Sequence, residues 1–288
     1  MTTPPTPLAA SARRVRSNAT PTALIGTTLF ALLVVVSFLG ALVVGAPQLD
    51  ATTISGPPSA SHVLGTDYQG RDNLALLVRG GADMVLLALI AGTLTTLVAV
   101  TLGSASAYVG GRVDALLMRA TDLWLTIPRF ILLVVVASTW RVQSTVALAA
   151  LIAVFSWPVL ARQVRANVLS LKEREYIEAA RLLDLGPVHM LLRELLPSMA
   201  PFIVVSTIQS MTQAIYQQVG LAFLGILPLR DNWGLLFSVA YGQNAIYFAD
   251  AAWSVLAPIG AICLLQLSLV MMARGYEETF NPRLRSQR

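Results

Sequence analysis

The stretch TALIGTTLFALLVVVSFLGALVV occupies residues 22–44 and carries no charged side chain. As a helix that rises about 1.5 Å per residue, it is long enough to cross a hydrocarbon core of about 30 Å. Arg13, Arg14 and Arg16 precede it, as in a secretory signal, but the apolar part of such a signal is only about 7–15 residues long. The sequence therefore predicts an uncleaved first transmembrane helix at residues 21–46.

Five further apolar stretches follow, each close to the length that a helix needs to cross a bilayer. They lie at residues 84–108, 120–137, 145–160, 200–224 and 252–273. Backbone groups in lipid must be hydrogen-bonded internally, and these runs are too long and too uniformly apolar for barrel strands. We therefore expect an all-α polytopic membrane protein with six transmembrane helices.

The composition agrees with a membrane protein. Hydrophobic residues make up 56% of the chain and charged residues 12%, whereas soluble domains average roughly 45–50% and about 25%. The lipid bilayer is thus an expected partner, and the net charge of +5 is explained by basic residues beside apolar spans rather than by nucleic-acid binding. The single cysteine, Cys263, excludes an intramolecular disulfide and a multi-cysteine metal site, and we interpret it as a packing residue.

The positive charges predict an orientation. If the N-terminus is cytoplasmic, 15 of the 20 Lys and Arg residues fall on cytoplasmic segments, as the positive-inside rule describes, and both termini lie in the cytoplasm. The predicted organisation, in chain order, is a disordered cytoplasmic tail at 1–20, the first helix at 21–46, an extracytoplasmic loop at 47–83, a five-helix core domain at 84–275 and a cytoplasmic C-terminal tail at 276–288.

The longest polar interruption on the cytoplasmic side, residues 161–198, has the pattern helix, break, helix. Gly186 and Pro187 mark the break, because glycine frees the backbone and proline restarts a helix at its first turn. The element is predicted to be an amphipathic hairpin outside the membrane that either transmits movement from a soluble partner or rests on lipid headgroups. One face of its first helix is defined by residues three or four apart: Tyr176, Ala179, Ala180 and Leu183.

Polar residues also occur within the spans. Pro128 removes a backbone donor and should kink the third span, while Arg129 must face protein or water or extend to the interface. Gln209, Gln213 and Gln217 recur every four residues in the fifth span. Such a stripe forms either a polar seam between helices or the lining of a pore. Our hypothesis is that these glutamines and Arg129 line a translocation path.

The segment Glu178-Ala179-Ala180, with Pro197 19 residues after the glutamate, resembles the EAA motif of ATP-binding-cassette (ABC) importer permeases. In that family the loop forms a coupling helix that docks into the ATPase subunit. The phrase at 172–181 is similar to the peptide and nickel branch. One position departs: the glycine usually found six residues after the glutamate is Asp184 here, and aspartate tolerates the left-handed backbone better than most residues.

Other phrases, in the order found in the same family, strengthen the resemblance. Residues 61–72 resemble the phrase H-x-L-G-T-D-x-x-G-R-D, and residues 108–122 resemble the link between the second and third spans. Residues 221–225, 233–234 and 281–284 resemble the end of the fifth span, the outer loop and the C-terminal signature. The resemblance covers roughly residues 20–285 and indicates the C-type permease of dipeptide, oligopeptide and nickel importers, a binding-protein-dependent transport inner membrane component.

The resemblance implies a type I ABC importer permease fold in a bacterial plasma membrane. It implies a homologous B-type permease, two ABC ATPase subunits and an extracytoplasmic peptide-binding protein as partners. ATP and Mg would be bound by the ATPases, with no cofactor in this chain. Di- and oligopeptides are the expected substrates, with nickel, glutathione or another small solute as the alternative. The residues implied to couple transport to the ATPase are Tyr176, Glu178, Ala179, Ala180, Arg181, Leu183, Asp184 and Gly186.

Competing functions have weaker support in the sequence. His62 with Asp67 and Asp72 could form a metal site, but turns and a pairing of Arg71 with a carboxylate explain this region better. His189 has no neighbouring ligand set and is interpreted as an interface residue. An intramembrane protease would need motifs that are absent, and a secondary transporter would normally carry ionisable residues at mid-membrane. We therefore expect no catalytic residue and no metal ligand.

Overall fold

A computed structural model describes residues 20–45, 47–50, 52–140, 142, 144–175, 177, 186–227 and 232–281 of the chain. Within these residues the regular elements are helices, accompanied by a single bridge between Thr66 and Asp72. The all-α prediction is therefore confirmed. The helices are α1 (Pro21–Val43), α2 (Asn73–Val109), α3 (Gly111–Leu125), α4 (Arg129–Trp140), α5 (Thr145–Lys172), α7 (Pro187–His189), the π-helix η1 (Met190–Leu195), α8 (Leu196–Ser198), α9 (Ala200–Phe223), α10 (Trp233–Gly242), the 3₁₀ turn η2 (Ala245–Tyr247) and α11 (Trp253–Phe280).

Four of these helices, α1, α2, α5 and α11, are each long and apolar enough to cross a membrane. Two further spans are bent: α3 and α4 meet at 76°, and Met190–Ser198 meets α9 at 69°. If each bent pair counts as one span, the total is the six that the sequence predicts. The kink expected at Pro128 is confirmed, since α3 ends at Leu125 and α4 begins immediately after the proline.

Several predicted boundaries shift because polar residues continue helices that begin or end in the membrane. α2 begins at Asn73 rather than residue 84, since the Asp72 carboxylate caps it by accepting the Leu74 amide at 3.1 Å. α5 continues to Lys172, so the first part of the predicted hairpin at 161–198 extends the fourth span. α11 likewise runs to Phe280, into the predicted tail at 276–288. At the N-terminus, residue 20 is not part of a tail, because Thr20 is buried and caps α1.

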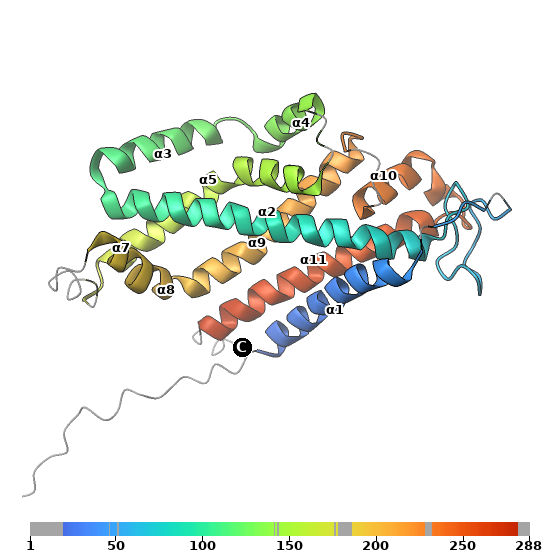
Figure 1. Ribbon diagram of the computed structural model, residues 1–288, viewed down its shortest axis with the longest axis horizontal. Helices are drawn as coiled ribbons and strands as arrows, with labels where there is room; N and C mark the ends of the chain where they lie inside the picture. Colours follow the sequence, from blue (N-terminus) through green and yellow to red (C-terminus); the bar gives the residue numbers. More distant parts are fainter. Residues whose placement is uncertain are drawn as a thin grey trace, which may run out of the picture.

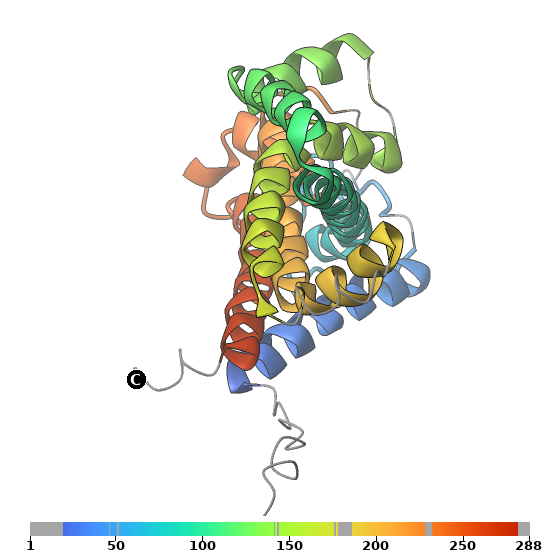
Figure 2. The same ribbon diagram turned by 90° about the vertical axis from the view of Figure 1, so that its left-hand side faces the viewer.

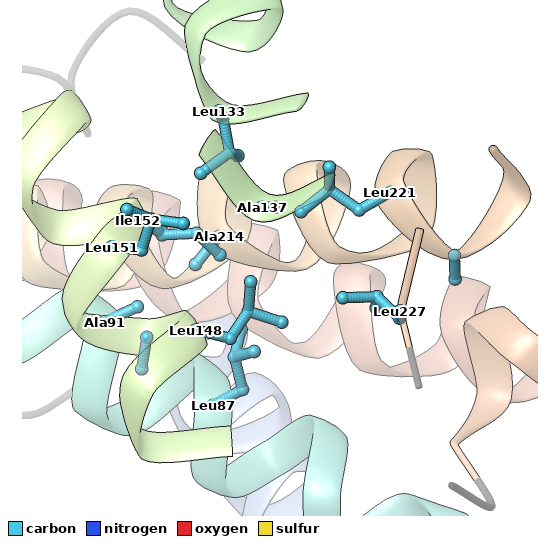
Figure 3. Close-up of a cluster of buried hydrophobic side chains, with 12 residues drawn as sticks. Leu87, Ala91, Leu133, Ala137, Leu148, Leu151, Ile152, Ala214, Leu221 and Leu227 are labelled. Atoms are coloured by element: carbon cyan, nitrogen blue, oxygen red, sulfur yellow. The ribbon is translucent and has the colours of Figure 1, made fainter. Parts of the chain in front are cut away.

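The long helix α2 runs through the middle of the bundle beside α5 and α9, whereas α3 and α4 lie on the side opposite α1 (Figures 1 and 2). Glycines let the helices approach closely. A Cβ atom added at Gly92 would lie 3.0 Å from the backbone nitrogen of Met211 in α9, and one at Gly103 would lie 2.9 Å from the Val164 Cβ in α5. Figure 3 shows one core cluster, where Leu87 of α2, Leu148 and Ile152 of α5, and Leu221 of α9 meet.

Helix α1 lies at the edge of the bundle, side by side with α11 (Figure 1). The two helices touch where Gly26 faces Met271 and Gly275 faces Ala23. The Thr20 hydroxyl donates to the Gly275 carbonyl at 2.9 Å and fixes the start of α1 to the end of α11. The rest of α1 is strongly exposed and apolar, as expected of a lipid-facing helix: Leu24, Leu32, Val35, Leu39 and Leu42.

Residues 47–50 and 52–72 belong to a loop at the end of the bundle that carries α10, here called the α10 end (Figure 1). The Asp67 carboxylate organises the loop by accepting the amides of Gln69 and Arg71 at 2.9 and 2.8 Å, and it pairs with the Arg71 guanidinium at 2.7 Å. The expected turn with a carboxylate-paired arginine is therefore confirmed. His62 lies 4.0 Å from Asp72, and the described residues contain no cluster of three metal-ligating side chains.

Candidate functional site: a polar cavity between α5, α9 and α11

A cavity of about 470 Å³ lies between α5, α9 and α11, with single contributions from α2 and α4. This volume falls within the range of roughly 300–1,000 Å³ that is typical of small-molecule sites. The cavity is unusual for a chain so rich in apolar residues, because much of its wall is polar. Hydroxyl and amide side chains supply that wall: Thr95, Ser156, Gln163, Ser206, Gln209 and Gln213.

Two residues that the sequence predicts for the translocation path are joined at this cavity. The Arg129 Nη2 atom donates to the Gln213 Oε1 atom at 3.0 Å, across the gap between α4 and α9. Gln209, one turn earlier on α9, lines the same cavity. The break at Pro128 explains the position of Arg129, because it starts α4 at the point where the chain bends by 76° away from α3. Arg129 thus faces protein, as one of the sequence interpretations expects.

Gln217 lies elsewhere. Its side chain is buried, with 5% of its surface exposed, and its amide nitrogen donates to the Ser156 hydroxyl of α5 at 3.2 Å. It is not among the residues that line the cavity. The contact is a polar seam between two helices, the alternative that the sequence leaves open for this stripe. The side-chain amide oxygens (Oε1) of Gln217 and of the neighbouring Gln218 are buried without a hydrogen-bond partner among the described residues.

Sequence reasoning missed two charged residues of the cavity, Arg274 and Glu277 of α11. Both are exposed and lie in the last turns of α11. The C-terminal end of α11 points toward the end of the bundle that carries α7, here called the α7 end (Figure 1). The signal that could have found them is their spacing. Together with Val270 and Ala273 they recur every three or four residues, so they continue one face of α11 past its apolar part.

A second polar cluster joins α3 to α5 at the α7 end. The Arg165 guanidinium donates from Nε and Nη2 to the two carboxylate oxygens of Asp114, each at 2.6 Å. The Ser106 hydroxyl donates to the same carboxylate at 2.5 Å. The pair is made possible by a tight turn between α2 and α3, where Gly110 and Gly111 both have positive φ. Two-point pairing of this kind fixes orientation as well as distance.

The end of α5 is fixed to the same turn. The Lys172 ammonium donates to the Ala107 carbonyl at 2.8 Å and lies 5.8 Å from the centre of the Tyr108 ring. Five residues further along the chain, Ile177 is fully buried in a cluster with Val164 of α5 and with Met190 and Leu195 of η1. The predicted hairpin is therefore attached to the bundle by both polar and apolar contacts.

Most of the predicted coupling residues lie outside the described part of the chain: Tyr176, Glu178, Ala179, Ala180, Arg181, Leu183 and Asp184. Gly186 is described and exposed, and a Cβ atom added to it would meet no atom within 4 Å. α7 begins at Pro187, which confirms the predicted restart of a helix after the break. His189, at the end of α7, is partly exposed, and its role at an interface stays a prediction.

The fold and the cavity together define a class of protein: a helical multi-span membrane protein with a polar cavity between α5, α9 and α11 that is open to the surface of the single chain. Residues 99–285 match the family described as binding-protein-dependent transport system inner membrane component. The chain belongs to this family, which confirms the resemblance drawn from the sequence. It is a transport subunit and a multi-pass inner membrane component.

Relatives with curated descriptions agree with this family. A Brucella suis protein named "putative peptide permease protein" is 35% identical over 240 residues, which cover 82% of this chain and 78% of the relative. The oligopeptide transport system permease protein OppC of Mycobacterium tuberculosis is 30% identical over 244 residues, which cover 84% of this chain and 82% of the relative. Both matches extend over most of each chain.

Proposed function

We propose that the chain is the C-type permease of an ABC importer and forms one half of a membrane pathway for short peptides. The observation that carries the proposal is the polar cavity with the Arg129–Gln213 hydrogen bond on its wall. A peptide crossing a membrane must exchange water for other hydrogen-bond partners at its amides and termini. Glutamine amides, hydroxyls and a guanidinium provide such partners, and binding weak enough to permit release is what conduction requires.

A peptide substrate is also suggested by the names of the relatives. Nickel as a bare ion fits the cavity less well, because among the described residues that line it Glu277 is the only carboxylate and neither histidine nor cysteine is present. Glutathione and other small solutes are not favoured, because the relatives are named as peptide and oligopeptide permeases. Selectivity among peptides is assigned to the extracytoplasmic binding protein that delivers them.

The other half of the pathway is proposed to come from a homologous B-type permease. Gln209 and Gln213 are exposed on the surface of this single chain, although they lie near the middle of α9. Amide side chains at this depth would be unfavourable against lipid. A second permease that covers this face would close the pathway around them.

Two ATPase subunits are proposed to drive transport from the cytoplasmic side, on which we also propose that both termini of this chain lie. They would bind ATP and Mg, and this chain would hold no cofactor. They would dock at the segment that contains Glu178, Ala179 and Ala180. Lys172 and Ile177 attach the beginning of that segment to α2, α5 and η1. A displacement of the segment by the ATPases would therefore move these helices as well.

The test is ATPase activity of the complete importer in lipid, stimulated by its peptide-loaded binding protein. Glu178→Lys and Ala180→Arg should abolish the stimulation or prevent assembly with the ATPases. Glu173→Lys is the matched control, because it reverses an exposed charge at the end of α5 outside the motif, and it should keep the stimulation. Normal coupling in both motif variants would contradict the proposed docking site. Absence of peptide-dependent stimulation in the unaltered importer would contradict the peptide substrate.

A further inference from the structure

Three charged side chains line the cavity: Arg129 of α4, and Arg274 and Glu277 of α11. Arg129 bonds to the neutral Gln213, and within the described residues none of the three takes part in an ion pair. A charge within a membrane span, such as Arg129, is costly without a counter-charge and is commonly part of a substrate or ion pathway, whereas Arg274 and Glu277 are exposed near the end of α11. The presence of these three charged side chains in the lining of one cavity therefore points to a solute that supplies the counter-charges.

The three charges are separated along the axis of the bundle. The Gln266 side-chain amide of α11 donates to the Thr212 backbone carbonyl of α9 at 3.3 Å, so α11 contacts α9 beside Gln213, the hydrogen-bond partner of Arg129. Glu277 lies 11 residues further along α11 than Gln266, and at about 1.5 Å per residue this is roughly 16 Å toward the α7 end. Arg274 lies between them. The cavity thus has a cation at its inner end and a carboxylate near the α7 end.

A solute with opposite charges at its two ends matches this arrangement. An extended peptide spans roughly 3.3–3.6 Å per residue, so four or five residues cover about 16 Å. A shorter peptide can reach both charged groups once the lengths of the Arg129 and Glu277 side chains are counted. Side chains on a helix lean toward the start of that helix, and this directs Glu277 back toward Arg129. A short peptide with free termini has the required length and charge.

We propose that the cavity is a transient site for zwitterionic short peptides, in which Arg129 binds the terminal carboxylate and Glu277 binds the terminal ammonium group. The proposal rests on the proposed function and adds which groups recognise the peptide ends. It also sets the orientation of the bound peptide, with its amino terminus closer to the α7 end. Gln213 has a positioning role, since it occupies one donor of the Arg129 guanidinium and leaves four of the roughly five N–H donors for a carboxylate.

The experiment uses a thiol as a reporter inside the cavity. Gln209→Cys is made together with Cys263→Ser, so that the reporter is the only cysteine of this chain. The complex with its partner subunits, without nucleotide and without binding protein, is treated with a water-soluble thiol reagent. Its rate of modification is measured with millimolar tetra-alanine, N-acetyl-tetra-alanine or tetra-alanine amide. Omitting the binding protein ensures that the result reports the permease alone.

Tetra-alanine should slow the modification, and blocking either terminus should weaken this protection roughly threefold, as expected for one partly exposed ion pair. In Glu277→Gln, N-acetylation should no longer weaken protection while amidation still does. Arg129→Gln should show the opposite pattern, and Arg129→Lys should restore sensitivity to amidation. Glu278→Gln, an adjacent carboxylate on α11 that does not line the cavity, is the control and should behave like the unaltered chain.

Three results would overturn the inference: no protection by any peptide, equal protection by all three, or effects of blocking that are the same in every variant. A measurement of tetra-alanine uptake by the complete importer shows whether the inference about terminal recognition has failed or the proposed function itself has failed. If uptake occurs but the protection pattern is absent, only the terminal recognition is wrong. If no peptide is taken up, the proposed function itself is wrong.

Discussion

The Asp114 carboxylate and the Arg165 guanidinium form a two-point ion pair that joins the start of α3 to the second half of α5, 51 residues later in the chain. Both side chains are partly buried, with 19% and 30% of their surface exposed. Together with Lys172, which bonds to the end of α2, the pair ties three helices together at the α7 end. The predicted coupling segment begins immediately after this junction.

Loss of this ion pair is expected to weaken the fold. Asp114→Asn should lower the free energy of unfolding by about 2 kcal/mol, because it removes charge-assisted hydrogen bonds from Arg165 and leaves that guanidinium partly buried. Thermal unfolding in detergent measures the effect. The exchanged pair Asp114→Arg with Arg165→Asp should recover part of the loss. If the double variant is no more stable than either single one, the pairing is not the cause.

Close packing of α2 against α9 predicts a strong effect at Gly92. Gly92→Val should destabilise the bundle by about 1–3 kcal/mol, since the new side chain would meet the Met211 backbone and push the helices apart. Gly260→Val in α11 is the matched control, because a Cβ atom there meets no neighbour within 4 Å. The comparison is made by thermal unfolding of the two variants, and equal stability would show that α2 and α9 do not pack at this glycine.

The two glutamines one turn apart on α9 are expected to respond in opposite ways. Gln213→Leu should reduce peptide uptake with little change in stability, because Gln213 faces the cavity and holds Arg129. Gln217→Leu should leave uptake intact and be neutral or stabilising, since it replaces a buried amide whose oxygen has no partner. Uptake into vesicles and thermal unfolding are measured for both. A larger loss of uptake in Gln217→Leu would show that the pathway lies against the α5 seam instead.

The buried Ile177 predicts how the coupling segment is held. Ile177→Ala should cost about 2–5 kcal/mol of local packing against Met190 and Leu195, and should loosen the segment that precedes the motif. ATP hydrolysis per peptide transported should rise, because ATPase movements would reach the bundle less faithfully. Ile131→Ala, at a side chain that is 58% exposed on α4, serves as the control. Unchanged stoichiometry in Ile177→Ala would remove Ile177 from the coupling route.

The glutamine stripe shows where inference from spacing fails. A helix turns about 100° per residue, so residues four apart are offset by roughly 40°, and two such steps accumulate to roughly 80°. Gln209 and Gln213 therefore share the cavity while Gln217 rotates into the seam with Ser156. The first two members of the stripe share one polar face, and their role in a translocation path stays a prediction. Which of two neighbouring helices the third one meets depends on packing that no local pattern contains.

Helix ends show the same limit. The start of α2 lies among polar residues, including Arg79 and Asp83, and hydropathy alone misses it. The reason is that hydropathy reports the solvent around a residue, whereas a helix continues as long as its backbone hydrogen bonds and caps are satisfied. The capping aspartate, Asp72, was the only local signal for the true start.

By itself the sequence determined that this protein lies in a lipid bilayer, that it is helical, that a span breaks at Pro128 and which family it belongs to. The first three follow from local chemistry, because long apolar runs favour lipid, such runs in lipid form helices when they are too long for barrel strands, and proline cannot donate a hydrogen bond. The family follows from the resemblance of the sequence motifs. Only the tertiary structure decided that Arg129 meets Gln213, that Asp114 meets Arg165, and that Arg274 and Glu277 belong to the cavity. Those contacts join residues far apart in the chain, and close packing of the helices is what brings them together.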